Sequence, residues 1–212
     1  VVTPRTAFAQ SRATTDPAQL QAGYRLLFSG DKNAAAAHFD GVAKTNPDDL
    51  PLRYGWLMAE RQRLDNKELR PNFEKAIDAI IDQAEKRYDK NPKDGEAPFY
   101  LANSHFLRAE YRFSYDKGMW GAARDGANAK GYIDKYIKQH PENGDAYLVQ
   151  GMYNYYVDIA PAFAKVLRLF LFLPSGDRKN GLKQLERAAE KGTLFGPEAT
   201  LILAEIYARY EN

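Results

Sequence analysis

The stretch GEAPFYLANSHFLRAEYRFSY (95–115), followed by WGAARDGANAKGYIDKYIKQHP (120–141), carries the strongest structural signal of the chain. Small and apolar residues suited to a helix crossing occur in both segments, one helical turn apart in the second: Leu101, Ala102, Ala129, Ile133 and Tyr136. Pro141 closes the second segment, and a proline at this place ends a helix. The pattern predicts an α-hairpin that cannot bury its apolar face unless other hairpins stack on it.

The same signature recurs four times along the chain. Its positions in the first copy are Ala22, Gly23, Ala35, Phe39 and Val42. Successive copies close at Pro47, Pro92 and Pro141, so that the later copies span 45 and 49 residues. Repeats that bury their faces only against neighbours build a solenoid. We therefore predict an all-α, right-handed superhelical solenoid of α-hairpins, with elongated helices and one inserted apolar helix.

The predicted repeat domain covers residues 17–212 and follows an arm of residues 1–16. Its approximate units are residues 17–47, 48–92, 93–141 and 142–192, with a terminal helix in 193–212. Aspartate at a helix start accepts hydrogen bonds from the free N–H groups of the first turn. The expected capping residues are Asp16, Asp31, Asp145 and Asp177. The last helix is expected from about Pro197 to Tyr210, with proline in its first turn.

The first residues look like the end of a secretory signal peptide. Ala7-Phe8-Ala9 followed by Gln10 matches the small-x-small pattern of a cleavage site, and the chain opens on Val1 without an initiator methionine. We expect an exported protein of the bacterial periplasm. The alternative is a plain disordered arm in which this short pattern occurs by chance.

Composition excludes several classes of partner and site. The chain has 30 basic and 28 acidic residues and a formal net charge of +2, which is too balanced to favour a nucleic-acid partner. The absence of cysteine excludes disulfides and thiolate zinc sites within these residues. No uncharged apolar stretch reaches 18 residues, so the sequence predicts no transmembrane segment.

Catalytic motifs are also missing from the sequence. It contains no G-x-S-x-G, P-loop or dinucleotide-binding glycine pattern. Its three histidines, His38, His105 and His140, do not stand in a spaced metal-binding motif. We therefore expect a protein that is not an enzyme and that holds no metal and no cofactor.

An apolar insert interrupts the repeats at residues 162–173. Its apolar residues would cover most of a helix circumference, which indicates burial on several sides or contact with something apolar. Three interpretations stay open. The insert fills the mouth of the superhelix, or it forms a wall of an apolar ligand channel with Leu167 and Phe170, or it lies on a membrane surface with Lys165 and Arg168 at the headgroups.

The helix pairs resemble tetratricopeptide repeats over nearly all of residues 17–210. A more specific pattern is similar to bacterial exported tetratricopeptide proteins, to the T-component of periplasmic TRAP-type transport systems, and, in its G-D-R element, to the tetratricopeptide-39 group. It comprises GMYNYY (151–156), Pro161, GDRKNG (176–181), Ala188-Ala189 and Gly192. The resemblance implies a helical-repeat fold that acts by binding, and the T-component implies the handling of a hydrophobic ligand.

The repeat register places a set of side chains on the concave face, where a partner would bind. The set comprises Tyr54, Met58, Arg61, Gln62, Asn103, Phe106, Met152, Tyr155 and Tyr156. Arg61 and Arg63 also suggest a site that reads a peptide carboxylate, since a guanidinium fork fits that group. The plainer interpretation of these two arginines is a solvated helix end.

Three functions follow from this pattern. The leading one is a scaffold that binds a peptide or protein partner in its concave groove, with apolar and aromatic anchors for affinity. The main alternative is a periplasmic carrier that holds a small hydrophobic ligand in a channel lined by the 162–173 insert, including Leu167 and Phe170. The third is structural assembly through self-association, which would cover the insert with a second copy.

Overall fold

The computed structural model describes residues 15–116, 118–160 and 174–211. Within these ranges the chain forms nine α-helices and no β-strand, so the predicted all-α class is confirmed. The helices are α1 (Pro17–Phe28), α2 (Lys32–Thr45), α3 (Leu50–Arg61), α4 (Arg70–Lys90), α5 (Ala97–Tyr111), α6 (Met119–Gln139), α7 (Ala146–Ile159), α9 (Arg178–Lys191) and α10 (Gly196–Arg209). A 3-10 turn (Lys67–Leu69) precedes α4, and a π-helical segment (Arg112–Asp116) extends α5.

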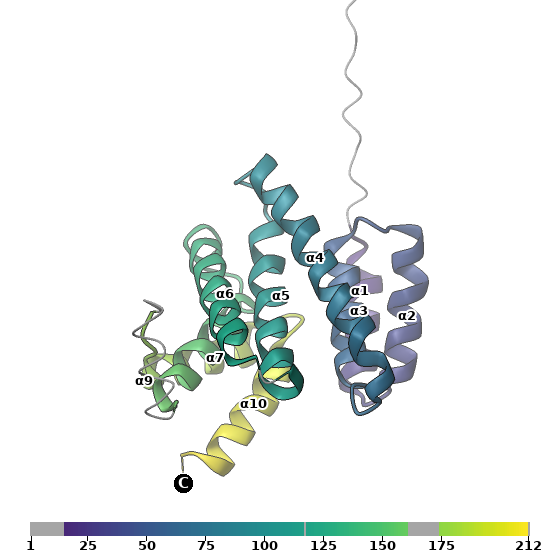
Figure 1. The fold of residues 1–212 in the computed structure, drawn as a ribbon. Coiled ribbons are helices and arrows are strands. Elements are labelled where there is room, and N and C mark those ends of the chain that lie inside the picture. Colours follow the sequence, from purple (N-terminus) through teal and green to yellow (C-terminus); the bar gives the residue numbers. More distant parts are fainter. Residues whose placement is uncertain (1–14, 117, 161–173, 212) are drawn as a thin grey trace, which may run out of the picture.

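Helices that follow one another in the chain pack as pairs. The pairs are α1 with α2, α3 with α4, α5 with α6, and α7 with α9. The first helices of the pairs also contact each other in succession, from α1 through α3 and α5 to α7. Figure 1 shows the pairs following one another across the molecule. We call the side that these first helices share the inner face.

Local sequence explains where most helices begin. Asp16, Asp31 and Asp177 each accept a hydrogen bond from a backbone N–H in the first turn of the helix that they precede, at 2.9 to 3.0 Å. These three predicted caps are confirmed. The prediction for Asp145 is wrong, because its carboxylate makes no capping hydrogen bond to α7. It binds instead to a turn 50 residues further along the chain, which is described with the site.

Glycines let the first two pairs approach closely. The fully buried ring of Phe39 on α2 lies against Gly23 on α1 and Gly55 on α3. A Cβ atom on either glycine would overlap this ring. Gly23 and Phe39 both belong to the repeated sequence signature, which therefore marks a close helix contact in this pair.

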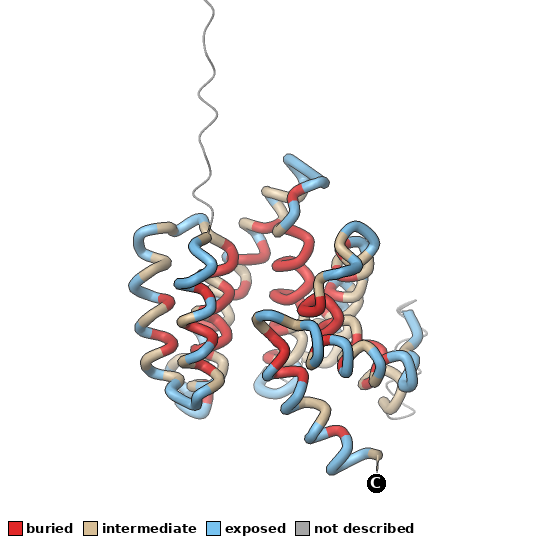
Figure 2. The backbone as a smooth tube through the Cα atoms, turned by 180° about the vertical axis from the view of Figure 1, so that it is seen from behind, coloured by how far each residue is buried: buried red, intermediate tan, exposed pale blue. Residues whose placement is uncertain are grey.

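The centre of the molecule is α5. Every residue from Ala97 to Leu107 except Phe106 is buried. This helix packs between α4 and α6 and also contacts α3 and α7. Figure 2 shows the buried residues concentrated where helices face one another, while the connecting turns and most of α10 are exposed. A continuous core of this kind requires the neighbouring pairs, as the sequence pattern indicates.

The last helix departs from the succession of pairs. α10 packs on α9, and the residue before it, Phe195, lies on the inner face against aromatic rings of α1, α3 and α5. The chain thus returns to the first helices through Phe195, while α10 itself lies below α5 and α7 in the view of Figure 1, away from α1, α2 and α3. This return brings together residues that are more than 130 positions apart, such as Arg61 and Glu198.

Two expectations concern segments outside the described residues. They are the signal-like pattern Ala7-Phe8-Ala9 and the apolar insert at 162–173, with Lys165 and Arg168. Among the helices that the structure does describe, none combines the length and the apolar character needed to cross a membrane.

Candidate functional site

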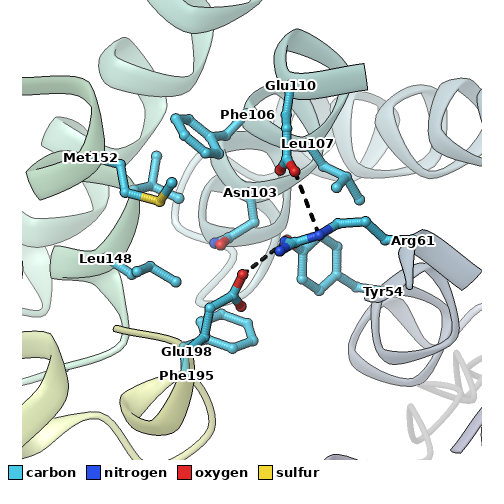
Figure 3. A pocket seen from close by; sticks show the side chains of 11 residues that line it. Tyr54, Arg61, Asn103, Phe106, Leu107, Glu110, Leu148, Met152, Phe195 and Glu198 are labelled. Atoms are coloured by element: carbon cyan, nitrogen blue, oxygen red, sulfur yellow. Dashed lines mark hydrogen bonds and ion pairs between the residues drawn. The ribbon is translucent and has the colours of Figure 1, made fainter. Parts of the chain in front are cut away.

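A small cavity lies on the inner face, where α3, α5 and α7 meet the start of α10 (Figure 3). Its volume is about 10 Å³, which is about the space that one water molecule needs. The lining residues are Tyr54, Arg61, Asn103, Phe106, Leu107, Glu110, Leu148, Val149, Met152, Phe195 and Glu198. We call this set the inner-face site. It combines an apolar and aromatic wall with one cation and two carboxylates.

Five side chains that the sequence predicted for the concave face come together here. They are Tyr54, Arg61, Asn103, Phe106 and Met152. Tyr54 and Arg61 stand seven residues apart on α3, and Asn103 and Phe106 stand three apart on α5, so each pair shares one side of its helix. Their common orientation explains why a repeat register could find them.

The other predicted residues lie elsewhere. Met58 is buried in the core, and Gln62 is exposed at the end of α3, where its backbone carbonyl accepts a hydrogen bond from Lys32. Tyr155 is fully buried, and its hydroxyl donates to Glu211 at 2.6 Å.

Three predicted residues remain: Tyr156, Leu167 and Phe170. Tyr156 packs beside Tyr210. Leu167 and Phe170 fall outside the described residues.

Arg61 holds the charge of the inner-face site. Its Nη1 donates to Oε1 of Glu198 at 2.7 Å, and its Nε lies 3.6 Å from Oε1 of Glu110. Burial by itself would lower the pKa of Arg61, but the carboxylates of Glu198 and Glu110 outweigh it and raise the pKa above its usual value. The guanidinium therefore stays charged. Arg63, by contrast, pairs with Glu60 and does not line the site.

The two neighbouring carboxylates are placed differently. The Glu198 side chain is only 9% exposed, and its Oε2 is buried with no hydrogen-bond partner among the described residues. Burial raises the pKa of Glu110, which the charge of Arg61 lowers only in part. Arg61 thus faces one carboxylate that uses a single oxygen and a second one at longer range. Neither forms the bidentate pair that a guanidinium can make.

Phe195 fills the space beside this ion pair. Its ring centroid lies 5.5 Å from that of Tyr24, 6.0 Å from Tyr54 and 5.9 Å from Phe99, to which it is nearly parallel. The ring is 1% exposed. Since the three partners come from α1, α3 and α5, one side chain of the C-terminal segment contacts three successive pairs at once.

Asp145 holds the turn that positions Phe195. Its carboxylate accepts hydrogen bonds from the Thr193 hydroxyl at 3.0 Å, from the Leu194 N–H at 3.0 Å and from the Phe195 N–H at 2.8 Å. Asp145 has helical backbone angles at the start of α7, so its side chain is free to point away from that helix. We call residues 193–195 the docking turn. This one buried carboxylate fixes the start of α10 on the inner face.

A second group of charged side chains lies between α4, α5 and α6. The buried carboxylate of Asp125 accepts hydrogen bonds from His105 Nδ1 at 3.0 Å, from Arg108 at 2.7 and 3.0 Å, and from Arg112 at 2.7 Å. Burial would raise the pKa of Asp125, but His105 and Arg108 lower it below the usual value. A carboxylate with this many donors serves as a structural anchor.

The His105–Asp125 pair does not extend to a nucleophile in the part of the chain that the structure describes. His105 Nε2 is buried there without a hydrogen-bond partner, and the ring stacks on Tyr132. A Ser-His-Asp triad would need a hydroxyl at this nitrogen. Among the described residues, moreover, no three histidine, aspartate or glutamate side chains gather as metal ligands.

Sequence analysis missed Phe195, Glu198, Glu110 and Asp145 as parts of the site. Each looks ordinary in its own segment, and Arg61 and Glu198 are 137 positions apart. The sequence signal that comes nearest is Phe195 itself, a large apolar residue directly before the Gly196-Pro197 helix start.

The comparisons with known proteins add no relative. No protein-family model matches the chain. No curated protein matches it at the level required of a relative. The candidate site therefore stands on its geometry and chemistry.

Proposed function

We propose that the protein is a non-enzymatic scaffold that binds a polypeptide segment of a partner on the inner face of a right-handed, tetratricopeptide-like solenoid. One observation carries the proposal: a polypeptide segment, the docking turn with the first turn of α10, already occupies this face. The face accepts an aromatic ring between α1, α3 and α5 and a carboxylate at Arg61. Aromatic side chains and arginine, which this face supplies at Tyr54 and Arg61, are enriched among the residues that dominate the energy of protein interfaces.

The enclosed space at the site is too small for a drug-sized ligand. Pockets for drug-sized molecules measure about 300 to 1,000 Å³, whereas the enclosed space at the inner-face site is about 10 Å³. The carrier hypothesis depends on Leu167 and Phe170, which lie outside the described residues. It therefore stays the alternative, without an observation in the described residues that favours it.

The cellular location of the protein is part of the same proposal. The Ala7-Phe8-Ala9 pattern supports export to the bacterial periplasm. A scaffold of this kind would there meet partner proteins outside the cytoplasm.

Selection of peptides on the full chain tests the proposed function. Random peptides displayed on phage are selected on the immobilised protein, and the best are measured by fluorescence anisotropy. We expect Phe106→Ala and Met152→Ala to weaken binding at least about tenfold, since both remove apolar wall from the site. Lys44→Ala, on the exposed side of α2, is the matched control and should change nothing. Peptides that bind Phe106→Ala and Met152→Ala as tightly as the wild type would contradict the proposal.

Native mass spectrometry separates the scaffold from the carrier. A mass of a few hundred daltons that leaves the purified protein on activation would support the carrier. We expect the mass of the chain alone, because the described site has room for about one water molecule.

A further inference from the structure

We infer that the docking turn and the first turn of α10 imitate the segment of the partner that binds to the inner face. The partner segment then carries an aromatic residue and, three positions later at the start of a helix, a carboxylate. It competes with Phe195 and Glu198 for the inner face. This inference rests on the proposed function and deepens it. It specifies both the chemistry of the partner and the device that regulates access.

The spacing of the two anchors defines the recognised pattern. Phe195 is the residue directly before α10 and Glu198 stands three positions later in its first turn, and both side chains line the inner-face site (Figure 3). The aromatic ring enters between Tyr54 and Phe99, and the carboxylate meets Arg61. A partner helix with the same two groups at the same spacing would fit the same two places.

The ion pair between Glu198 and Arg61 is incomplete, so that a competing carboxylate could bind Arg61 with more hydrogen bonds. Glu198 binds Arg61 through one oxygen, and its other oxygen is buried without a partner in the described part of the chain. A buried polar atom without a hydrogen bond destabilises the state that contains it. A carboxylate that approaches Arg61 with both oxygens would gain the second hydrogen bond that Glu198 lacks.

The docking turn and α10, which together form the resident segment, are held by hydrogen bonds at the two ends and by packing on α9 between them. Asp145 holds the docking turn, and Glu211 after α10 accepts hydrogen bonds from Tyr155 and Arg178. Between them α10 exposes large apolar side chains, with Leu201 at 66% and Tyr207 at 45%. Helices with few buried contacts open at lower free energy than core helices. Removing the hydrogen bonds between Asp145 and the docking turn should therefore raise the fraction of molecules in which the docking turn has left the inner face.

Weakening the docking turn should increase binding in trans. The probe is a fluorescein-labelled peptide that copies residues 193–204, and the proteins are the wild-type chain and its Asp145→Asn and Glu198→Gln variants. We expect both variants to bind the probe at least about tenfold more tightly than the wild type, because apparent affinity rises with the open fraction. Lys44→Ala, which removes a solvent-exposed ion pair with Asp40 on α2, is the matched control and should bind like the wild type.

The chemistry of the probe is tested in the same assay. Replacing the phenylalanine or the glutamate of the peptide by alanine should weaken binding about tenfold, as expected for an anchor residue of an interface. Arg61→Gln combined with Asp145→Asn should remove the gain, since the anchor for the carboxylate is then lost.

Several outcomes would overturn the inference. Folded Asp145→Asn and Glu198→Gln proteins that bind the probe no better than the wild type would show that the segment is a permanent part of the core. If Asp145→Asn fails to fold, Glu198→Gln decides alone, because the amide keeps the shape of the side chain. Display-selected peptides that bind wild type and Asp145→Asn equally, without the aromatic and acidic pattern, would overturn this inference and leave the proposed function standing.

Discussion

Arg61 and Asp125 are charged side chains at least partly buried, and they differ in how many of their hydrogen bonds to charged partners are formed. Asp125 accepts hydrogen bonds from His105, Arg108 and Arg112, so each of its oxygens is in use. Arg61 faces Glu198 through one hydrogen bond and has Glu110 at 3.6 Å. The first arrangement fits a permanent link between helices. The second fits an interaction that another carboxylate can replace.

The link at Asp125 gives a prediction for stability. Asp125→Asn should lower the free energy of unfolding by about 3 kcal/mol at pH 7, because two guanidinium groups would lose their buried counter-charge. Urea unfolding of wild type and variant measures the difference. Lys130→Gln, which removes a more exposed pair with Asp134 on the same helix, is the control and should cost under about 1 kcal/mol.

The same variant predicts the direction of a pH dependence. The folded pKa of Asp125 lies below the unfolded value of about 3.9, so the stability that the ionised group contributes is present above about pH 4. It is lost as the pH falls through the folded pKa, where the carboxyl becomes neutral. The gap between wild type and Asp125→Asn should therefore be smaller at about pH 3 than at about pH 7. An equal gap at both values would rule out the lowered pKa.

At the scale of elements, close helix contacts depend on residues without side chains. Phe39 fits between α1 and α3 because Gly23 and Gly55 leave room for its ring. Gly41, on the exposed side of α2, has no atom of another side chain or element within 4 Å of the place where a Cβ atom would lie. The two kinds of glycine should therefore respond oppositely to alanine.

Alanine substitutions test this distinction. Gly23→Ala should destabilise the protein by about 1 to 3 kcal/mol, since overpacking outweighs the better helix propensity of alanine. Gly41→Ala should stabilise it by up to about 1 kcal/mol, because only propensity changes. Thermal melts of the two variants beside the wild type give both signs. A stabilising Gly23→Ala would show that Phe39 moves aside freely.

At the scale of the whole molecule, the C-terminal segment contacts helix pairs that lie far before it in the sequence. Phe195 contacts the pairs of α1, α3 and α5, while Asp145 on the fourth pair holds its backbone. The molecule thus combines a central helix, α5, that is buried nearly throughout with a last helix, α10, that is largely exposed. Such a contrast predicts unequal local stability.

Hydrogen exchange measured by mass spectrometry should show this inequality. Amides of α5 are expected to exchange through global unfolding, and amides of α10 at least about tenfold faster through local opening. In Asp145→Asn the exchange of α10 should rise further while that of α5 changes less. Equal protection of both helices in the wild type would contradict a separately opening C-terminal segment.

The helices and much of their pairing could be predicted from the residues alone, because the signals are local. Asp16 caps the helix that directly follows it, and Pro47 stands just after the end of the helix before it. Helical spacing likewise showed that Tyr54 and Arg61 share one side of α3. These features depend on neighbours within a few positions.

The site required the folded chain. Whether Asp145 caps α7 or holds the docking turn depends on where a segment 50 positions away comes to lie, and the same holds for Arg61 and Glu198. Those positions follow from the packing angles between helices, which no local pattern specifies. The periodicity of the chain therefore specified the faces of its helices, and long-range packing determined which of its own residues cover them.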